Sequence, residues 1–267
     1  MIVFIQIEIV YTPIYICGIL YIMKEDKIYL YGKHALREAL MSNARIIKKV
    51  FLSPSASENP DVFNLMKEYK ITPSITKGSS GKTSEDAVHQ GVIAEIAISE
   101  LYTPFEDVLD LLKKEDNPMV VILDELQDPH NVGAIIRTAV AFGAKAIFLP
   151  EHNQAPITGV VIKTSAGMVF RIPIVRIGNV NQTIRKLKDN NFWIYGLLMD
   201  GDTSLKDAKF DTPTVVIIGN ESEGIRQKTL ELCDVKLSIH MTENCESLNA
   251  SVAASVVLYE YFRNFKK

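Results

Sequence analysis

The sequence predicts an α/β protein with a mostly parallel sheet in its C-terminal part and a smaller α/β unit before it. Between residues 118 and 267, short apolar segments alternate with stretches of helical periodicity. Those apolar segments lack a polar face, which is typical of strands in a parallel sheet that helices cover on both sides. The chain has 267 residues, enough for about two domains that each bury a core.

Residues 24–98 are expected to form the smaller unit. Between residues 34 and 42, four apolar residues recur at helical spacing. The expected order is strand 28–32, helix 34–42, strand 48–53, helix 61–70 and strand 91–97. The polar segment KGSSGKTSED, residues 77–86, predicts a loop before the last strand. With 11 basic and 9 acidic residues, the unit has a net charge of +2.

The C-terminal part, residues 118–267, is expected to hold the main sheet. Its strands are predicted at 119–125, 146–150, 193–199, 214–219 and 235–240, and its helices at 131–142, 181–190, 224–232 and 249–264. Its 16 basic and 16 acidic residues leave no net charge. The stretch before it, residues 99–117, has six acidic and two basic residues and predicts a solvated, flexible helical linker.

Residues 1–23 form an apolar extension. No basic residue precedes position 24, so the extension lacks the first region of a signal peptide. Gln6, Glu8 and Pro13 interrupt the roughly 20 apolar residues that a membrane helix needs. We expect translation to start at Met23, with the extension outside the biological protein. An extra strand and a segment that lies on a membrane are the alternatives.

The composition excludes several classes of protein. Hydrophobic residues make up 47% of the chain and charged residues 23%, which is typical of a soluble globular protein and not of a disordered one. The net charge of −3 argues against a polybasic arm, although a local basic patch can still bind nucleic acid. The three cysteines form no CxxC pair, so we expect a reducing cytoplasm and neither a disulfide framework nor a zinc site.

Other patterns do not predict a site. GSSGKT at 78–83 is similar to a phosphate-binding loop, but the position five residues before Gly81 is Thr76 and not glycine. A mobile surface loop is the expectation there. The five histidines are scattered without metal-ligand spacing, so no bound metal is expected. The GxGxxG turn of dinucleotide-binding units and the GxSxG turn of hydrolases are both missing.

Polar segments that follow two of the predicted strands carry candidate chemistry. In LDELQDPHNVGAIIR, Asn131 is expected to open a helix as its N-cap residue, and Arg137 follows six residues later. In VVIIGNESEGI, Gly219 ends a buried strand, where a flat ligand can lie against the backbone. Glu221 and Glu223 then place carboxylates at the edge of the sheet, the usual location of ligands in open α/β sheets.

A third polar segment lies near the C-terminus. Ser247 and Asn249 precede a predicted helix whose first residues are small, so that its amide end is accessible to an anionic group. Each of the three segments taken alone is also explained as an ordinary capped helix or tight turn.

Taken together, these segments resemble one family. LDxxxDPxN followed by arginine, then GNExxG, then SLNxSVAxS resemble, in this order, the SpoU branch of the SPOUT RNA methyltransferases. YLYGKHALREAL and HQGVIAEI resemble the small RNA-binding domain, of ribosomal-protein L30e type, that precedes the catalytic domain in bacterial 23S rRNA guanosine-2′-O-methyltransferases. The sequence departs from many relatives at Asn220, where they have alanine. A position that lines the site with its backbone should tolerate that change.

The resemblance implies a fold and a reaction. The fold is a mostly parallel SPOUT-type sheet whose C-terminal segment forms a trefoil knot. The reaction is transfer of the methyl group of S-adenosyl-L-methionine to a ribose 2′-hydroxyl. The implied cofactor-binding residues are Gly219, Ile239 and Leu248, and the implied catalytic residues are Asn131, Arg137, Glu221, Ser247 and Asn249, with Ser251 a weaker candidate.

The roles of these residues follow from the chemistry of the hydroxyl group. A ribose hydroxyl is a poor nucleophile, so the site must share its proton and align it with the methyl group. The family scheme makes Arg137 central, often as the base. Because a guanidinium stays protonated in proteins, we expect Arg137 to hold the target phosphate and to stabilise the developing alkoxide. Glu221 and Asn249 would orient Arg137 or the ribose, and Asn131 would secure the loop.

The resemblance also implies partners. Structured RNA is the expected substrate, with a guanosine of 23S rRNA favoured over tRNA, and neither DNA nor a membrane is expected. A tRNA methyltransferase and a non-catalytic RNA-binding or ribosome-assembly module are the alternatives. A homodimer through the C-terminal helix is expected, because that helix carries more apolar surface than one sheet face needs, at Val252, Val256, Val257, Tyr259 and Phe262. The alternative for this helix is an internal core helix.

Overall fold

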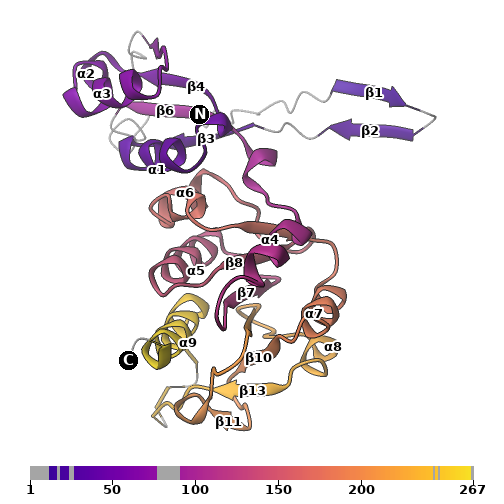
Figure 1. The fold of residues 1–267 in the computed structure, drawn as a ribbon. Helices are drawn as coiled ribbons and strands as arrows, with labels where there is room; N and C mark the ends of the chain where they lie inside the picture. Colours follow the sequence, from indigo (N-terminus) through magenta and orange to yellow (C-terminus); the bar gives the residue numbers. More distant parts are fainter. Residues whose placement is uncertain are drawn as a thin grey trace, which may run out of the picture.

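The computed structural model describes residues 12–16, 19–23, 27–76, 91–242, 244–245 and 247–265. A four-stranded sheet lies towards one end of the molecule and a seven-stranded sheet towards the other (Figure 1). The loop predicted at 77–86, with the GSSGKT pattern inside it, lies outside the described residues.

Part of the apolar extension forms a hairpin. Strands β1 (Thr12–Ile16) and β2 (Ile19–Met23) pair antiparallel in a sheet of their own. This corresponds to the alternative of extra strand structure in the extension. A translation start at Met23 stays a prediction.

The smaller unit has the predicted order of elements. Its strands are β3 (Lys27–Tyr31), β4 (Ile47–Leu52), β5 (Ser74–Ile75) and β6 (Val92–Ala97), in the spatial order β3-β6-β4-β5. Its helices are α1 (Lys33–Asn43), α2 (Pro54–Ser57) and α3 (Pro60–Glu68), with short 3-10 turns at Ala44–Ile46 and Ile98–Leu101. Helix α1 buries the four apolar residues that predicted it. Strand β5 was not predicted.

The larger sheet is parallel throughout its described strands. They are β7 (Met119–Asp124), β8 (Ala146–Pro150), β9 (Ile174–Ile177), β10 (Trp193–Leu198), β11 (Thr203–Ser204), β12 (Thr214–Gly219) and β13 (Val235–Ser238). Their spatial order is β11-β13-β10-β12-β7-β8-β9. The predicted α/β fold with a mostly parallel sheet is confirmed. A knot in the last segment stays a prediction.

Helices cover both faces of this sheet. They are α4 (Phe105–Leu112), α5 (Pro129–Ala141), α6 (Gly159–Thr164), α7 (Val180–Lys188), α8 (Gln227–Leu230) and α9 (Ala250–Phe265), with 3-10 turns at Met168–Phe170 and Leu205–Asp207. One hydrophobic core contains every second residue of the central strands, such as Val121, together with buried residues of α5, α6 and α9. A second hydrophobic core, on the other face of the sheet, contains the strand residues in between, such as Val120, together with buried residues of α4 and α7. This explains why the strands lack a polar face.

Several predicted boundaries were wrong for local reasons. Helix α5 starts at Pro129, because Asp128 is its N-cap residue and accepts a hydrogen bond from the His130 amide at 2.8 Å. Asn131 is therefore inside the helix. The helix predicted at 224–232 is shortened to α8, since Gly224 takes a φ of +70° in a turn. Helix α6 and strand β9 were missed because six and four residues are too few to show a period.

The segment predicted as a solvated, flexible linker is a packed helix. Val108, Leu109 and Leu112 of α4 are buried in the second core, against the seven-stranded sheet. The acidic residues of the segment explain the wrong expectation, because they occupy only the outer side of an amphipathic helix.

The two main sheets are joined by direct packing. A Cβ atom on Gly159, at the start of α6, would lie 2.7 Å from the Tyr29 carbonyl oxygen of β3. Arg171 forms an ion pair with Glu38 of α1, and the buried residues of both units belong to one continuous core. Figure 1 shows α6 between the small unit and α5. Within the described residues, no helix is long and apolar enough to span a membrane.

Candidate active site

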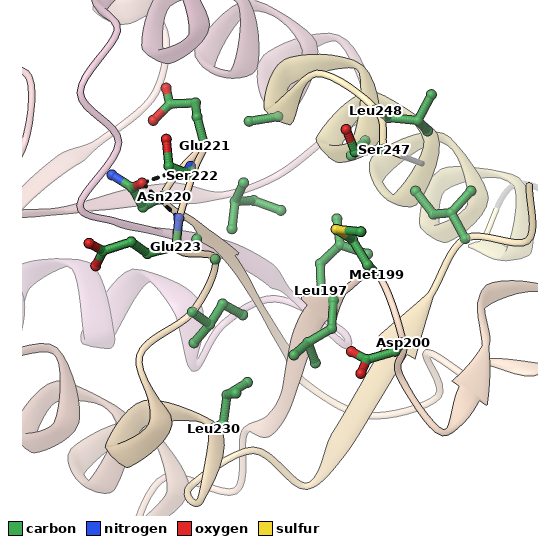
Figure 2. A pocket seen from close by; sticks show the side chains of 18 of the residues that line it. Leu197, Met199, Asp200, Asn220, Glu221, Ser222, Glu223, Leu230, Ser247 and Leu248 are labelled. Carbon is green, nitrogen blue, oxygen red and sulfur yellow. Dashed lines mark hydrogen bonds between the residues drawn. The ribbon is translucent and has the colours of Figure 1, made fainter. Parts of the chain in front are cut away.

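A cavity of about 710 Å³ lies at the carboxyl ends of β10, β12 and β13. Ligands of open α/β sheets bind at this edge, and the volume is within the ~300–1,000 Å³ of small-molecule sites. Figure 2 shows the cavity between the turn Asn220–Glu223 on one side and Leu197–Asp200 with Ser247 and Leu248 on the other. Three segments that are far apart in the sequence therefore build its walls.

The predicted cofactor-binding residues come together in this cavity. Gly219, Ile239 and Leu248 all line it, although Gly219 ends β12, Ile239 follows β13 and Leu248 lies before α9. Two of the predicted catalytic residues, Glu221 and Ser247, line it as well. Apolar side chains and peptide groups thus make up much of the wall, as a ligand with a flat ring requires.

The reason for glycine at position 219 differs from the prediction. A Cβ atom there would lie 2.3 Å from the carbonyl carbon of Gly224 and 2.4 Å from the Ile225 nitrogen. It would collide with the turn after β12 before it met a ligand. Gly219 is therefore required by the close approach of the backbone to itself.

Asn220 holds the same turn. Its backbone exchanges two 3.0 Å hydrogen bonds with Gly224, and its Oδ1 accepts hydrogen bonds from the Ser222 and Glu223 amides at 2.8 and 3.1 Å. Its Nδ2 donates to the Glu125 carbonyl oxygen at 2.8 Å. The Asn220 side chain thus adds hydrogen bonds that fasten the turn to the end of β7.

Glu221 is engaged by the loop before α5. Its carboxylate accepts hydrogen bonds from the Gln127 and Asp128 amides at 3.2 and 3.3 Å and from Asn131 Nδ2 at 3.0 Å. Burial alone would raise the pKa of Glu221, but these hydrogen bonds outweigh it and hold the pKa below its ordinary value. These partners are groups of residues 127–131 and do not include Arg137, and the expectation that Glu221 orients Arg137 or the ribose stays a prediction.

The network continues to helix α9. Asn249 Nδ2 donates to Asn131 Oδ1 at 3.0 Å, while Asn249 Oδ1 accepts from the Ser251 amide at 2.9 Å and from the Ser251 hydroxyl at 2.6 Å. Asn249 is thereby the N-cap residue of α9. Sequence reasoning also placed Asn249 at the start of this helix. Asn131, which is 6% exposed, links the two sides. Three of the predicted polar residues form one chain of hydrogen bonds.

Arg137 lies apart from this chain. It is on the exposed side of α5, and among the residues that the structure describes none forms a hydrogen bond or ion pair with it. His130, two helical turns earlier, is exposed on the same side. The structure thus leaves the guanidinium accessible to a ligand from solvent.

Sequence reasoning missed one group of charges beneath the cavity. Arg226 lines the cavity and forms ion pairs with Asp124 and Glu125, both at 2.8 Å. Burial raises the pKa of Asp124, although the ion pair with Arg226 acts in the opposite direction. The only signal in the sequence is a charged residue directly after the GNESEGI segment. Arg226 clamps the turn after β12 to the end of β7.

The residues present fit the cofactor that the resemblance implies. Ile218, Ile239 and Leu248 offer apolar surface to a nucleoside, and Asp200 and Glu223 place carboxylates in the wall, where they suit the positive charge of a sulfonium. Among the described residues no cluster of His, Cys, Asp and Glu could hold a metal ion.

Comparisons with known proteins agree with this geometry. Residues 118–259 match the family described as "SpoU rRNA Methylase family", and residues 29–102 match "RNA 2'-O ribose methyltransferase substrate binding". A "Putative TrmH family tRNA/rRNA methyltransferase" of Staphylococcus epidermidis is 35% identical over 241 residues, which cover 89% of this chain and 96% of that protein.

Solved structures share the fold. The SpoU methyltransferase AviRb from Streptomyces viridochromogenes, in complex with AdoMet, has a TM-score of 0.76 at 23% identity and covers 89% of this chain and 90% of its own. The A. aeolicus TrmH/SpoU tRNA modifying enzyme has a TM-score of 0.51 at 27% identity and covers 62% of this chain and 82% of its own. From the family match and the curated relative together, the chain belongs to the SpoU family of RNA 2′-O-ribose methyltransferases, which use S-adenosylmethionine.

Proposed function

We propose that this protein methylates the ribose 2′-hydroxyl of a guanosine in 23S rRNA, in the cytoplasm where ribosomes assemble. The observation that carries the proposal is the substrate-binding unit, residues 29–102, packed directly on the catalytic domain. The match to the A. aeolicus tRNA modifying enzyme covers only 62% of this chain, so it does not extend over both units in full. A domain beyond the catalytic one suits a large folded RNA, and methylation of tRNA is the second candidate.

The arrangement of polar groups supports a division of roles. S-adenosylmethionine, when bound in the cavity, supplies an activated methyl group. Arg137 holds the phosphate of the target nucleotide and stabilises the negative charge that develops on the ribose oxygen. Ser247 hydrogen-bonds the ribose, a role supported by its exposed position in the cavity wall. Glu221, Asn131 and Asn249 keep the loop before α5 and the start of α9 in position.

A homodimer through α9 belongs to the same proposal. Val252, Val256 and Tyr259 are exposed and spaced by four and three residues, so they form one apolar stripe on this helix. The aromatic ring of Phe142, the residue directly after α5, packs on the ring of Tyr259, and the two ring centroids are 5.5 Å apart. Val257, in contrast, is buried within its own chain and belongs to the core.

The trefoil knot is proposed with it. The cavity is built by the loops after three adjacent strands, β10, β12 and β13. In the first of these loops, a Cβ atom on Gly201 would lie 2.5 Å from the Lys236 carbonyl oxygen of β13. The loop after β10 therefore packs directly on β13, the strand that leads into the C-terminal segment.

Mapping of ribose methylation in rRNA and tRNA, from cells with and without the gene, tests the function. Loss of one methylated guanosine in 23S rRNA is the expected result. Loss of a tRNA methylation instead would select the second candidate. If no methylated ribose is lost and the purified protein transfers no methyl group to either RNA, the chain is a non-catalytic RNA-binding module.

A further inference from the structure

The small sheet presents aromatic side chains on its outer face. Tyr29 and Tyr31 of β3 are 44% and 41% exposed, whereas Leu30 between them is fully buried. Residues that alternate along a strand point to opposite faces. Leu30 belongs to the core that α1 and α3 also enter, so the two tyrosines lie on the face opposite that core.

The strand register extends this face across the sheet. Tyr31 is paired with Ile93 of β6, which is paired with Phe51 of β4, so the three side chains form one row. Tyr29, through Glu95, is in a row with the exposed Lys49. The face therefore combines flat aromatic surface with cationic side chains.

The charge of the face is positive on balance. Glu95 is 6% exposed and forms an ion pair with Lys27 at 3.5 Å, and Lys27 lies on the same face as Tyr29. Within the described part of the chain Lys49 has no acidic partner of this kind, which leaves one positive charge among Lys27, Glu95 and Lys49. Phosphate groups of a nucleic acid suit such a surface.

This face adjoins helix α6 of the catalytic domain. A Cβ atom on Gly159 would lie 3.3 Å from the Tyr31 ring, so the ring packs against the start of α6. Lys163, one turn further along α6, is exposed.

From α6 the exposed side chains continue to the catalytic arginine. Thr164 Oγ1 lies 3.5 Å from His130 Nδ1 of α5, and His130 shares the exposed side of α5 with Arg137. A continuous line of exposed groups thus runs from the aromatic face to Arg137, and Figure 1 shows β3, α6 and α5 stacked in this order.

We propose that unpaired bases of the RNA substrate stack on Tyr29 and Tyr31, while the RNA backbone crosses Lys163 and His130 to reach Arg137. This inference rests on the proposed function. Aromatic rings bind bases without regard to sequence because every base has a stacking face. Lysine and histidine side chains supply hydrogen-bond donors to phosphates along the way. The aromatic face then selects RNA with a single-stranded segment near the target nucleotide.

Binding and methylation of unmodified 23S rRNA transcribed in vitro test the stacking. Tyr29→Ala and Tyr31→Ala are each expected to raise the Kd for the transcript about tenfold or more, because one stacked base is lost. The rise of the melting temperature with S-adenosylmethionine should stay unchanged. Phe63→Ala is the matched control, since Phe63 is a 60% exposed aromatic residue on helix α3.

The comparison of Tyr29→Phe with Tyr29→Leu separates stacking from packing. Phenylalanine retains a stacking ring and should bind the transcript as the unchanged protein does, whereas leucine should bind as weakly as alanine. Equal binding by the two variants would overturn the proposal, whatever their stability. Loss of the dimer in Tyr29→Ala, seen by sedimentation with RNA binding unchanged, would assign the face to protein contacts and also overturn it.

Lys163→Gln tests the path between the face and Arg137. It should weaken binding and lower the slope of log Kd against log salt by about 0.7, the value for one phosphate contact of a single strand. Lys206→Gln, at an exposed lysine beside β11, should leave that slope unchanged. An unchanged slope in Lys163→Gln would contradict the path. Since binding is measured apart from methyl transfer, a transcript that is bound but not methylated counts against the proposed function and not against the face.

Discussion

The cofactor cavity and the surface around Arg137 differ in how completely their polar groups are already bonded. Around the cavity, Glu221, Asn131 and Asn249 form a chain of hydrogen bonds that exists without any ligand. Arg137 has no such partner within the described part of the chain. The difference indicates that the groups around the cavity are preorganised, and we expect the substrate to complete the surface around Arg137.

The largest expected effect is on the RNA side. Arg137→Ala should lower the rate of methyl transfer about 10²–10³-fold, because the charge that stabilises the alkoxide is lost. The melting temperature, with and without S-adenosylmethionine, should be nearly unchanged, since the Arg137 side chain is exposed. Single-turnover kinetics measure the rate of methyl transfer, and thermal unfolding measures the melting temperature. A variant that retains most of its activity would show that the assigned mechanism is wrong.

A charge on helix α9 should separate the subunits. Val256→Asp places a carboxylate in the apolar stripe at a position that is 37% exposed in the single chain. Analytical ultracentrifugation should then find monomers, where the unchanged protein forms dimers. Glu260→Gln, which removes a charge further along the same helix, serves as the control. A monomeric unchanged protein would contradict the interface.

Shortened chains test which region holds the cofactor. Residues 102–267 retain α4, and S-adenosylmethionine at a hundredfold excess over Kd should stabilise them by about 2.7 kcal/mol. Methylation of RNA by this chain should be far weaker than by the full protein. Residues 118–267 lack the buried Val108, Leu109 and Leu112 and should unfold at a lower temperature. Undiminished RNA methylation by either chain would contradict the role of the small unit.

The hydrogen-bond chain itself has a moderate expected effect. Asn131→Ala leaves Glu221 and Asn249 without their shared partner and should lower the free energy of unfolding by about 1–3 kcal/mol. Urea denaturation measures it. Ser251→Ala, at the outer end of the chain, should cost less. If Asn131→Ala unfolds at the same urea concentration as the unchanged protein, the network does not organise the cavity.

The smallest expected effect depends on pH. Because the folded-state pKa of Glu221 is held below its ordinary value of 4.5, its hydrogen bonds stabilise the protein above that pH. This contribution is lost as the pH falls through the folded-state pKa. Glu221→Gln should therefore show a weaker loss of stability as the pH falls below about 4.5. If the free energy of unfolding changes with pH in the same way in both proteins, the assigned hydrogen bonds of Glu221 are contradicted.

Local patterns determined much of the fold and the membership of the cavity. Apolar runs such as residues 119–124 and 214–219 predicted the central strands, because a strand between two layers of helices has no polar face. The motifs around Gly219, Ile239 and Leu248 predicted one cofactor site, and all three line the cavity. Strands and motifs of this kind depend on the spacing of residues that are close together in the sequence, so the sequence alone predicts them.

Only the tertiary structure decided which distant groups meet. The carboxylate of Glu221 binds amides more than 90 residues earlier, and Arg226 reaches Asp124 across the sheet. Helix α4 packs although its segment is acidic, because one apolar stripe is enough to bury a helix. The order of the strands in the sheet and the packing of the loops bring these groups together, and neither produces a periodic pattern in the sequence. The sequence by itself therefore determined the elements and the candidate residues, and the packing of the sheet decided their partners.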